Sequence, residues 1–289
     1  SYASQMHAFG ALDGFRRIAS KDKWLRIHNK QEWVDAYDPK NMDDLCKFFD
    51  YYLKGIKNDW PSTPRVRMSV LDPGGTDLVN VPEDNFPPSR VQYYSFYLDN
   101  KTMSLVDSPL AEASYVSYDT QEMDCRVNYT LEFKKDTKVV GFPSAKLWVE
   151  CQGYDDMDLF LRLVKTDADG NVLFQDSICY LYAGTDGRLR VSLRELDPKR
   201  STKYEPVQSF RRPQKLHEKE IVPVEIPLWP TAMQFHAGEK LEFIIAGYDY
   251  MPNYPFDRPV PAFDNHGIHI IHSGGPYDSC LHLPVLPDS

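Results

Sequence analysis

The sequence predicts a mixed fold, in which the end of a layered α/β sheet is followed by an all-β sandwich of the jelly-roll type. Three observations lead to this prediction. Residues 1–60 have the apolar period of helices, the later residues form short apolar runs between turn residues, and a polar segment with two prolines, residues 56–64, separates the two patterns. We therefore predict two parts, residues 1–60 and residues 61–289.

The first part contains two predicted helices and a strand between them. Residues 10–18 predict a helix, residues 23–28 a short strand, and a second helix of about 13 residues begins at Asn41 as N-cap and ends at Lys54-Gly55. Elements in this order are typical of the end of a βαβ-type sheet. The apolar face predicted for the second helix consists of Met42, Leu45, Cys46, Phe49, Tyr52 and Leu53.

The second part contains at least eight predicted strands and no convincing long helix, which favours a β-sandwich. Residues 167–171 predict a hairpin turn, because the glycine comes two positions too early for a calcium loop. The acidic run at residues 155–158 predicts a solvated strand entry. The predicted strands are residues 65–71, 91–98, 146–151, 159–165, 222–226, 241–246, 268–272 and 281–285.

The composition of the chain argues against some classes of partner. The net charge is −9 and no long run of Lys or Arg occurs, which argues against nucleic acid and anionic membranes. No apolar stretch approaches the roughly 20 residues that cross a bilayer, and no targeting signal is visible from Ser1 onward, although one could precede it. Five scattered cysteines without a CxxC motif favour reduced, buried thiols and a cytoplasmic location.

His28 is the first candidate for chemistry, because it ends the predicted strand at residues 23–28. Ligands of layered α/β enzymes bind beyond such strand ends, and a histidine there can serve as a general base. The alternative is that His28 is only a polar residue at the end of the strand. The later histidines do not predict a metal site, since His269 and His272 fall on opposite faces of one strand, and no cofactor is predicted.

Seven segments, in order, resemble a known enzyme family. The segments GALDGFRR (10–17), KWLRIH (23–28), FFDYYLKG (48–55) and PRVR (64–67) resemble the cocaine esterase and X-Pro dipeptidyl-peptidase family of α/β-hydrolases. The segments DDMDLF (155–160), RVSLRELD (190–197) and GGPYDS (274–279) are similar to the C-terminal jelly-roll domain of that family, which is galactose-binding-like. The resemblance implies that residues 1–60 end an α/β-hydrolase domain and that residues 61–289 form the jelly roll.

The resemblance also implies an activity. The family is expected to hydrolyse small esters, amides or peptides, as an esterase, acylase or X-Pro dipeptidyl-peptidase, through an acyl-enzyme formed on a Ser-His-Asp triad. His28 falls at the position of the catalytic histidine. No Gly-x-Ser-x-Gly occurs in the chain, so we expect the serine to come from an N-terminal α/β-hydrolase segment, in the same polypeptide or in a separate chain. A homo-oligomer is left open.

The acid of the triad is the main departure from the family. Ser4 stands where the family has its aspartate, so the acid is absent, relocated or replaced. Asp13, Glu32 and Asp35 are the candidates for a relocated acid. We expect His7 and Ser4 to contact the substrate, with a structural role for His7 as the alternative.

Two other functions remain open. One is a non-hydrolytic biosynthetic enzyme that reuses the same fold. The other is a carbohydrate- or protein-binding jelly roll, for which the aromatic-rich residues 248–256 are the candidate surface; the same residues could instead roof the hydrolase pocket.

Overall fold

The computed structural model describes the whole chain except residues 3–4, 177–180, 250–263 and 288–289. The N-terminal part contains α1 (Gln5–Arg17), β1 (Leu25–Arg26), α2 (Glu32–Ala36) and α3 (Pro39–Leu53), followed by a 3₁₀ turn at Trp60–Ser62. Both predicted helices and the predicted strand are therefore confirmed, although the strand is shorter than expected.

The N-cap of α3 differs from the prediction. Asp38 caps the helix by accepting a hydrogen bond from the Lys40 N–H at 3.0 Å, and Pro39 fits the first turn because its missing N–H needs no partner there. Asn41 lies inside the helix, where its side-chain amide donates to the Asp35 carbonyl at 2.8 Å. The helix ends as predicted, with Gly55 at a φ of 68°.

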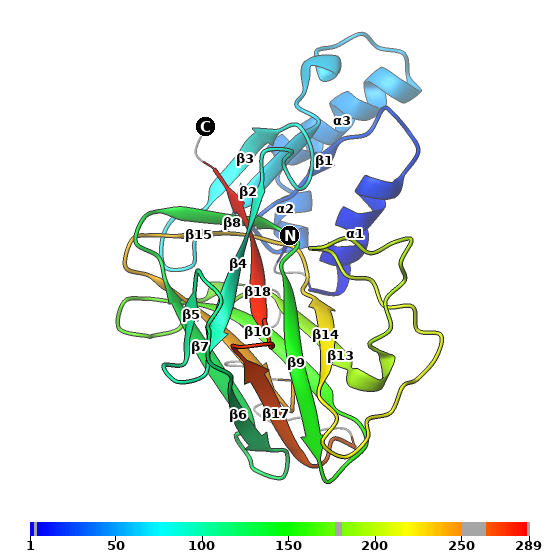
Figure 1. Cartoon of the computed structure of the whole chain (residues 1–289). Helices are drawn as coiled ribbons and strands as arrows, with labels where there is room; N and C mark the ends of the chain where they lie inside the picture. Colours follow the sequence, from blue (N-terminus) through cyan, green and yellow to red (C-terminus); the bar gives the residue numbers. More distant parts are fainter. Residues whose placement is uncertain (3–4, 177–180, 250–263, 288–289) are drawn as a thin grey trace.

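Most of the apolar face of α3 is exposed, although the ring of Tyr52 packs on Trp24, with 5.7 Å between the ring centroids. No residue of α3 is buried, and its predicted apolar residues Leu45 and Leu53 are 56% and 75% exposed. The side of the helix that meets the chain carries Asp44, which receives two hydrogen bonds of 2.8 Å from Arg67. Figure 1 shows α3 projecting from the body of the molecule.

A three-stranded sheet joins the two parts of the sequence. It has the order β1-β2-β3, in which β2 (Val66–Val70) runs parallel to β1 and β3 (Leu78–Glu83) is antiparallel to β2. The ladder continues past β1, because the Ile27 N–H donates to the Arg67 carbonyl and the Ser69 N–H to the Ile27 carbonyl, both at 2.9 Å. The division at residue 60 stays a prediction.

The rest of the described chain is mostly β. Thirteen strands follow the order β13-β10-β16-β7-β5-β4-β18-β9-β17-β6, with β14 on β9 and with β8 between β15 and β18; β11 (Gln175–Asp176) and β12 (Leu181–Tyr182) form a separate pair. The bounds are β4 (Gln92–Asp99), β5 (Ser104–Val106), β6 (Ser114–Asp119), β7 (Arg126–Glu132), β8 (Thr137–Gly141), β9 (Ser144–Gln152), β10 (Asp158–Thr166), β13 (Asp186–Arg190), β14 (Val222–Pro227), β15 (Thr231–Phe235), β16 (Lys240–Ala246), β17 (Ile268–Ser273) and β18 (Cys280–Leu286).

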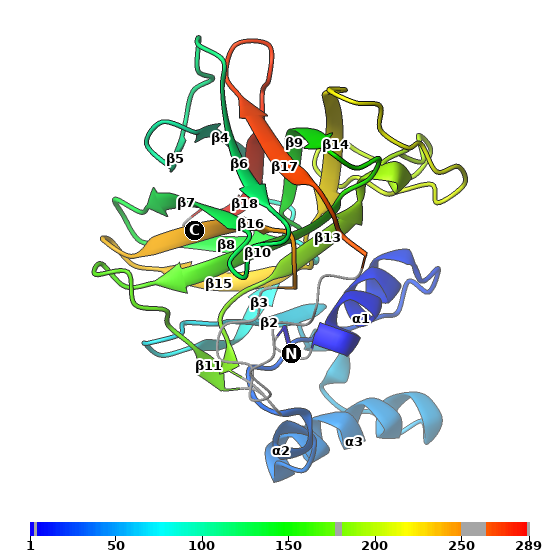
Figure 2. The ribbon, with the colours of Figure 1, turned by 90° about the horizontal axis from the view of Figure 1, so that it is seen from below.

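The arrangement of these strands buries a continuous core. Figure 2 shows β10, β13, β15 and β16 running between the N-terminal part and the strands β6, β9, β14 and β17. The core extends from Leu12 and Ile27 of the N-terminal part through Val66 and Met68 into the β strands. Burial of this apolar surface is the main force that holds the two parts together.

Each of the eight strand runs predicted after residue 64 is a strand in the structure. The turn at residues 167–171 is also confirmed, because the Asp167 carboxylate accepts from the Asp169 and Asn171 N–H groups at 2.9 and 2.8 Å. The prediction of a solvated acidic run is wrong for Asp156, which is buried and accepts from the Met157 and Ser192 N–H groups.

Candidate active site

His28 lies immediately after the last ladder residue of the β1 edge. Ile27 is buried and hydrogen-bonded to β2, and this fixes the backbone from which the His28 ring projects. The ring is partly exposed, and its Nε2 lies 3.3 Å from the main-chain nitrogen of Ser1. Within the described part of the chain, the buried Nδ1 has no hydrogen-bond partner of ordinary geometry.

The surroundings of His28 favour its neutral form. Burial lowers the pKa of the imidazole below its ordinary value of 6.5, and the positive charge of Arg26 acts in the same direction. The carboxylate of Asp35 and the backbone of Lys30 oppose this shift. A neutral imidazole is the form that can accept a proton.

Asp35 is the acidic side chain that acts on His28. It begins the last turn of α2 and is buried, and it receives two hydrogen bonds of 2.7 Å from the guanidinium of Arg26 and one of 3.1 Å from Asn41. Burial raises the pKa of Asp35, but the hydrogen bonds from Arg26 and the charge of His28 outweigh it, so the pKa lies below its ordinary value. Asp35 is therefore a fixed negative charge near His28.

The other predicted site residues are not brought to His28 by any described contact. Asp13 pairs with Arg17 on α1 at 2.6 Å, and His7 is exposed on the same helix. Glu32 lies in the first turn of α2. Ser4 lies outside the described residues, as do most of the aromatic residues 248–256.

The loop that carries His28 is held by a carboxylate from the next loop. The side-chain amide of Asn29 donates to Asp77 at 2.7 Å, and Gln175 of β11 donates to the same oxygen at 3.0 Å. The other oxygen of Asp77 accepts from the Asp72 N–H at 2.7 Å. One carboxylate thus connects the residue after His28, the β2–β3 loop and the β domain.

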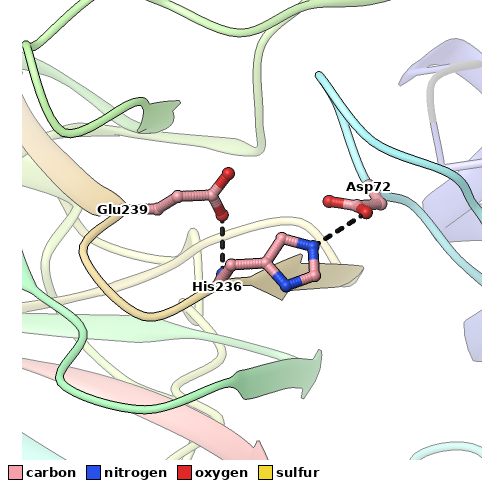
Figure 3. A group of neighbouring side chains, drawn as sticks. All are labelled: Asp72, His236 and Glu239. Atoms are coloured by element: carbon pink, nitrogen blue, oxygen red, sulfur yellow. Dashed lines mark hydrogen bonds and ion pairs between the residues drawn. The ribbon is translucent and has the colours of Figure 1, made fainter.

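A buried charge cluster lies beside this loop. Lys165 of β10 has a fully buried side chain, and its ammonium lies 2.7 Å from Asp72 and 2.9 Å from Glu239. His236 donates to Asp72 across 3.0 Å, while its backbone N–H donates to Glu239 at 2.6 Å (Figure 3). The hydrogen bonds that His236 donates to the carboxylates of Asp72 and Asp136 raise the pKa of its imidazole. Sequence reasoning missed this cluster, although a lysine within the apolar run of β10 was a signal for it.

Asp72, His236 and Glu239 also have the spacing of metal ligands, since one atom of each lies within 4.8 Å of the others. The Lys165 ammonium contacts both of these carboxylates. A divalent cation would be repelled by that charge at this distance. The lysine therefore supplies the positive charge that the carboxylates need.

The histidines of the β domain have separate partners. His269 contacts the Tyr118 hydroxyl at 3.2 Å, His272 contacts Glu150 at 3.0 Å, and His282 contacts Ser95 at 2.8 Å. Burial lowers the pKa of His269 and of His282 to about 4. These side chains satisfy buried polar groups of the sheets.

A cavity of about 400 Å³ lies away from the His28 loop. Phe9 and Arg16 of α1 form one wall, and Tyr204, Glu205 and Trp229 of the β domain form part of the other. The Arg16–Glu205 ion pair of 2.6 Å spans the two walls. None of the residues around His28 lines this cavity, so it is no substrate pocket for that histidine.

Comparisons with known proteins identify the family. The model of the X-Pro dipeptidyl-peptidase C-terminal non-catalytic domain matches residues 58–282. Two crystal structures of a CocE/NonD family hydrolase from Staphylococcus aureus are 34% identical in sequence, with TM-scores of 0.90 and 0.91 over 96% and 97% of this chain. The fold defines a C-terminal β domain of the X-Pro dipeptidyl-peptidase type. The chain belongs to the family of this X-Pro dipeptidyl-peptidase C-terminal domain and is similar to the CocE/NonD hydrolase, so the resemblance seen in the sequence is confirmed.

More distant structures share the fold. An aminopeptidase from the marine sediment archaeon Thaumarchaeota archaeon and an alpha-amino acid ester hydrolase are each 16% identical, over 84% of this chain and 44% of theirs, with TM-scores of 0.62 and 0.55. A comparison with curated protein sequences found no match. The chain spans about half of the Staphylococcus aureus hydrolase, 52% of its length, and His28 lies before the matched non-catalytic domain.

No helix in the described part of the chain has the length and apolar character needed to cross a membrane.

Proposed function

We propose that the chain is the C-terminal half of a serine hydrolase of the esterase, acylase or X-Pro dipeptidyl-peptidase type, in which His28 is the general base. The observation that carries this proposal is the position of His28 directly after Ile27, the last ladder residue of the β1 edge. There the neutral form of the imidazole is favoured, and the negative charge of Asp35 acts on the ring. An N-terminal α/β-hydrolase segment supplies the serine.

In the proposed reaction one ring nitrogen of His28 carries the proton, and Asp35 acts through its charge. His28 takes the proton of the serine hydroxyl while the serine oxygen bonds to the carbonyl carbon of an ester, amide or peptide. The imidazolium returns that proton to the leaving group as the acyl bond breaks, and water then releases the acyl group by the same steps. Asp35 stabilises the imidazolium electrostatically.

The exposed apolar surface of α2 and α3 supports a partner segment. Nine large apolar side chains of residues 33–56 are between 41% and 75% exposed, which is a large amount of apolar surface for so short a segment. We propose that this α2–α3 surface packs against the N-terminal α/β-hydrolase segment. The family relatives are long enough to contain such a segment, since this chain spans only 52% of the Staphylococcus aureus hydrolase. The residues are Trp33, Val34, Tyr37, Met42, Leu45, Phe49, Tyr52, Leu53 and Ile56.

The finer assignments follow from the same proposal. Residues 1–60 complete the α/β-hydrolase domain, and residues 61–289 form a jelly roll that borders the substrate pocket, to which His7 and Ser4 contribute. The buried, unpaired thiols of Cys125, Cys151 and Cys280 support a cytoplasmic location, where thiols stay reduced.

The experiment is turnover of a chromogenic ester and of an X-Pro peptide by the complete protein and by its His28→Gln variant. We expect His28→Gln to lose at least about 10³-fold in kcat, because the serine loses its base. His269→Gln is the matched control, since that buried histidine serves the sheet. Unchanged turnover by His28→Gln would refute the proposal.

A further inference from the structure

Within the described part of the chain, few hydrogen bonds hold the loop that carries His28. Beyond Ile27 the β1 ladder ends, and α2 begins only at Glu32. Between them, the side chain of Asn29 makes its hydrogen bond to Asp77, at 2.7 Å, and this contact lies one residue from His28. The position of Asp77 therefore bears directly on the position of the His28 ring.

Asp77 is in turn fixed by the β domain. It accepts from Gln175 of β11 at 3.0 Å and from the Asp72 N–H at 2.7 Å, so both carboxylate oxygens are occupied. Asp72 is anchored to the fully buried ammonium of Lys165 at 2.7 Å and accepts from the Thr76 N–H at 3.1 Å. Hydrogen bonds and the ion pair with Lys165 therefore hold the segment from Asp72 to Asp77 at both of its ends.

The loop between these aspartates contains a glycine that lets the chain fold over the Asp72 carboxylate. A Cβ on Gly75 would lie 2.0 Å from the Asp72 carboxylate, so glycine is required for the loop to fold over that group. Before Asp72, the Leu71 N–H donates to the Ala232 carbonyl at 2.9 Å, and the Gln234 N–H donates to the Leu71 carbonyl at 2.8 Å. The loop is therefore attached to β15 as well as to Lys165.

We propose that Asp77 is a positioning residue, through which the Lys165–Asp72 anchor of the β domain sets the place of His28. The inference rests on the proposed function and gives the non-catalytic domain a role in it. A displacement of about 1 Å at a reacting group can cost on the order of 100-fold in rate. Asp77 holds Asn29, the neighbour of His28, and so prevents such a displacement of the general base.

The test compares Asp77→Asn, Asn29→Ala and Gln175→Ala in the complete protein. We expect Asp77→Asn and Asn29→Ala to lower kcat by about 10- to 100-fold and to change KM by less than about threefold. Gln175→Ala should have a smaller effect, because Asn29 keeps its partner. The matched control is Asp99→Asn, since Asp99 also accepts from a backbone N–H and a side chain, Lys101 at 2.9 Å and Thr102 at 2.8 Å.

An exchange of the two side chains separates positioning from folding. Asn29→Asp alone places two carboxylates together and should be as harmful as Asp77→Asn. The double variant Asn29→Asp with Asp77→Asn restores a donor and an acceptor, and we expect its kcat to recover to within roughly threefold of the wild type. Rates are expressed per folded molecule, measured by circular dichroism.

A second readout does not depend on turnover. In ¹³C-histidine-labelled protein, the His28 ring signal, assigned by its loss in His28→Gln, should shift in Asp77→Asn and not in Asp99→Asn. If His28→Gln keeps full activity but this signal still shifts, the proposed function fails and the positioning stands. An unshifted signal with unchanged kcat in both Asp77→Asn and Asn29→Ala would overturn the inference.

Discussion

Both terminal nitrogens of Arg26 donate to the carboxylate of Asp35, each at 2.7 Å, and this ion pair ties β1 to α2 across the loop that carries His28. Asn41 uses a further lone pair of the same carboxylate. The charge of Asp35 raises the pKa of His28, but no described hydrogen bond joins the two side chains. Asp35 thus acts on the candidate base through its charge, while its hydrogen bonds hold the fold.

The Asp35→Asn substitution tests this division of roles. We expect it to lower the free energy of unfolding by roughly 2 kcal/mol, because the half-buried Arg26 loses its ionic partner. The kcat should fall by about tenfold, far less than the roughly 10⁴-fold loss that follows removal of a hydrogen-bonded triad acid. Urea unfolding and ester turnover of the complete protein measure both effects.

Asp13→Asn is the control for Asp35→Asn, because the Asp13–Arg17 pair lies on the partly exposed side of α1 and should contribute at most about 1 kcal/mol. A loss near 10⁴-fold in kcat without a loss of stability in Asp35→Asn would instead identify Asp35 as the acid itself.

Ser4→Asp tests the prediction that residue 4 stands at the position of the family's acid. We expect kcat of the complete protein to rise by at least about tenfold, because an acid that orients the imidazole supports up to about 10⁴-fold in rate. Ser4→Asn, which is similar in size but uncharged, should not reproduce the gain. If Ser4→Asp leaves turnover unchanged, residue 4 is not at the position of the acid.

The strands were predictable from the sequence because their burial pattern is local. The runs in β10 and β16 are short, rich in apolar residues and bounded by turn residues, so each strand is visible without its neighbours. Strands such as β6 and β7 were missed because polar residues and tyrosine occupy most of their positions.

The candidate site was only partly predictable, because its contacts join distant segments. His28 is marked by its place after a strand, but the Asn29–Asp77 bond spans 48 residues and the Lys165–Asp72 bond spans 93. The α3 helix shows the same limit. The apolar residues of α3 recur with the period of a helix, which predicted a buried face. Most of that face is exposed in this chain, and a periodic pattern does not show what covers it.

The pH dependence of turnover reports the protonation of His28. Only the neutral imidazole can accept the serine proton, and burial places the pKa of His28 below 6.5. The kcat/KM of the complete protein should therefore rise with pH to a plateau, with the midpoint of the rise below pH 6.5. Since Asp35 raises the pKa of His28, Asp35→Asn should move the midpoint to lower pH. A midpoint above 6.5 would contradict this account.

The α2–α3 surface can be tested by changing its most exposed leucines. The double variant Leu45→Gln with Leu53→Gln should lower the Tm of the complete protein by several degrees, because it removes apolar contacts with the N-terminal segment. Leu78→Gln with Val79→Gln is the matched control, since these side chains of β3 are 43% and 54% exposed but lie outside the surface. Equal shifts in Tm for both pairs would argue against a partner at α2 and α3.

Covalent labelling of the complete protein by a fluorophosphonate, followed by peptide mapping, tests the central claim most directly, since only an activated serine reacts. The account predicts one labelled serine, located N-terminal to residue 1 of this chain, and labelling at least about 10³-fold slower in His28→Gln. An unlabelled wild type would indicate a non-hydrolytic use of the fold. Equal labelling of the wild type and His28→Gln would show that His28 is not the base.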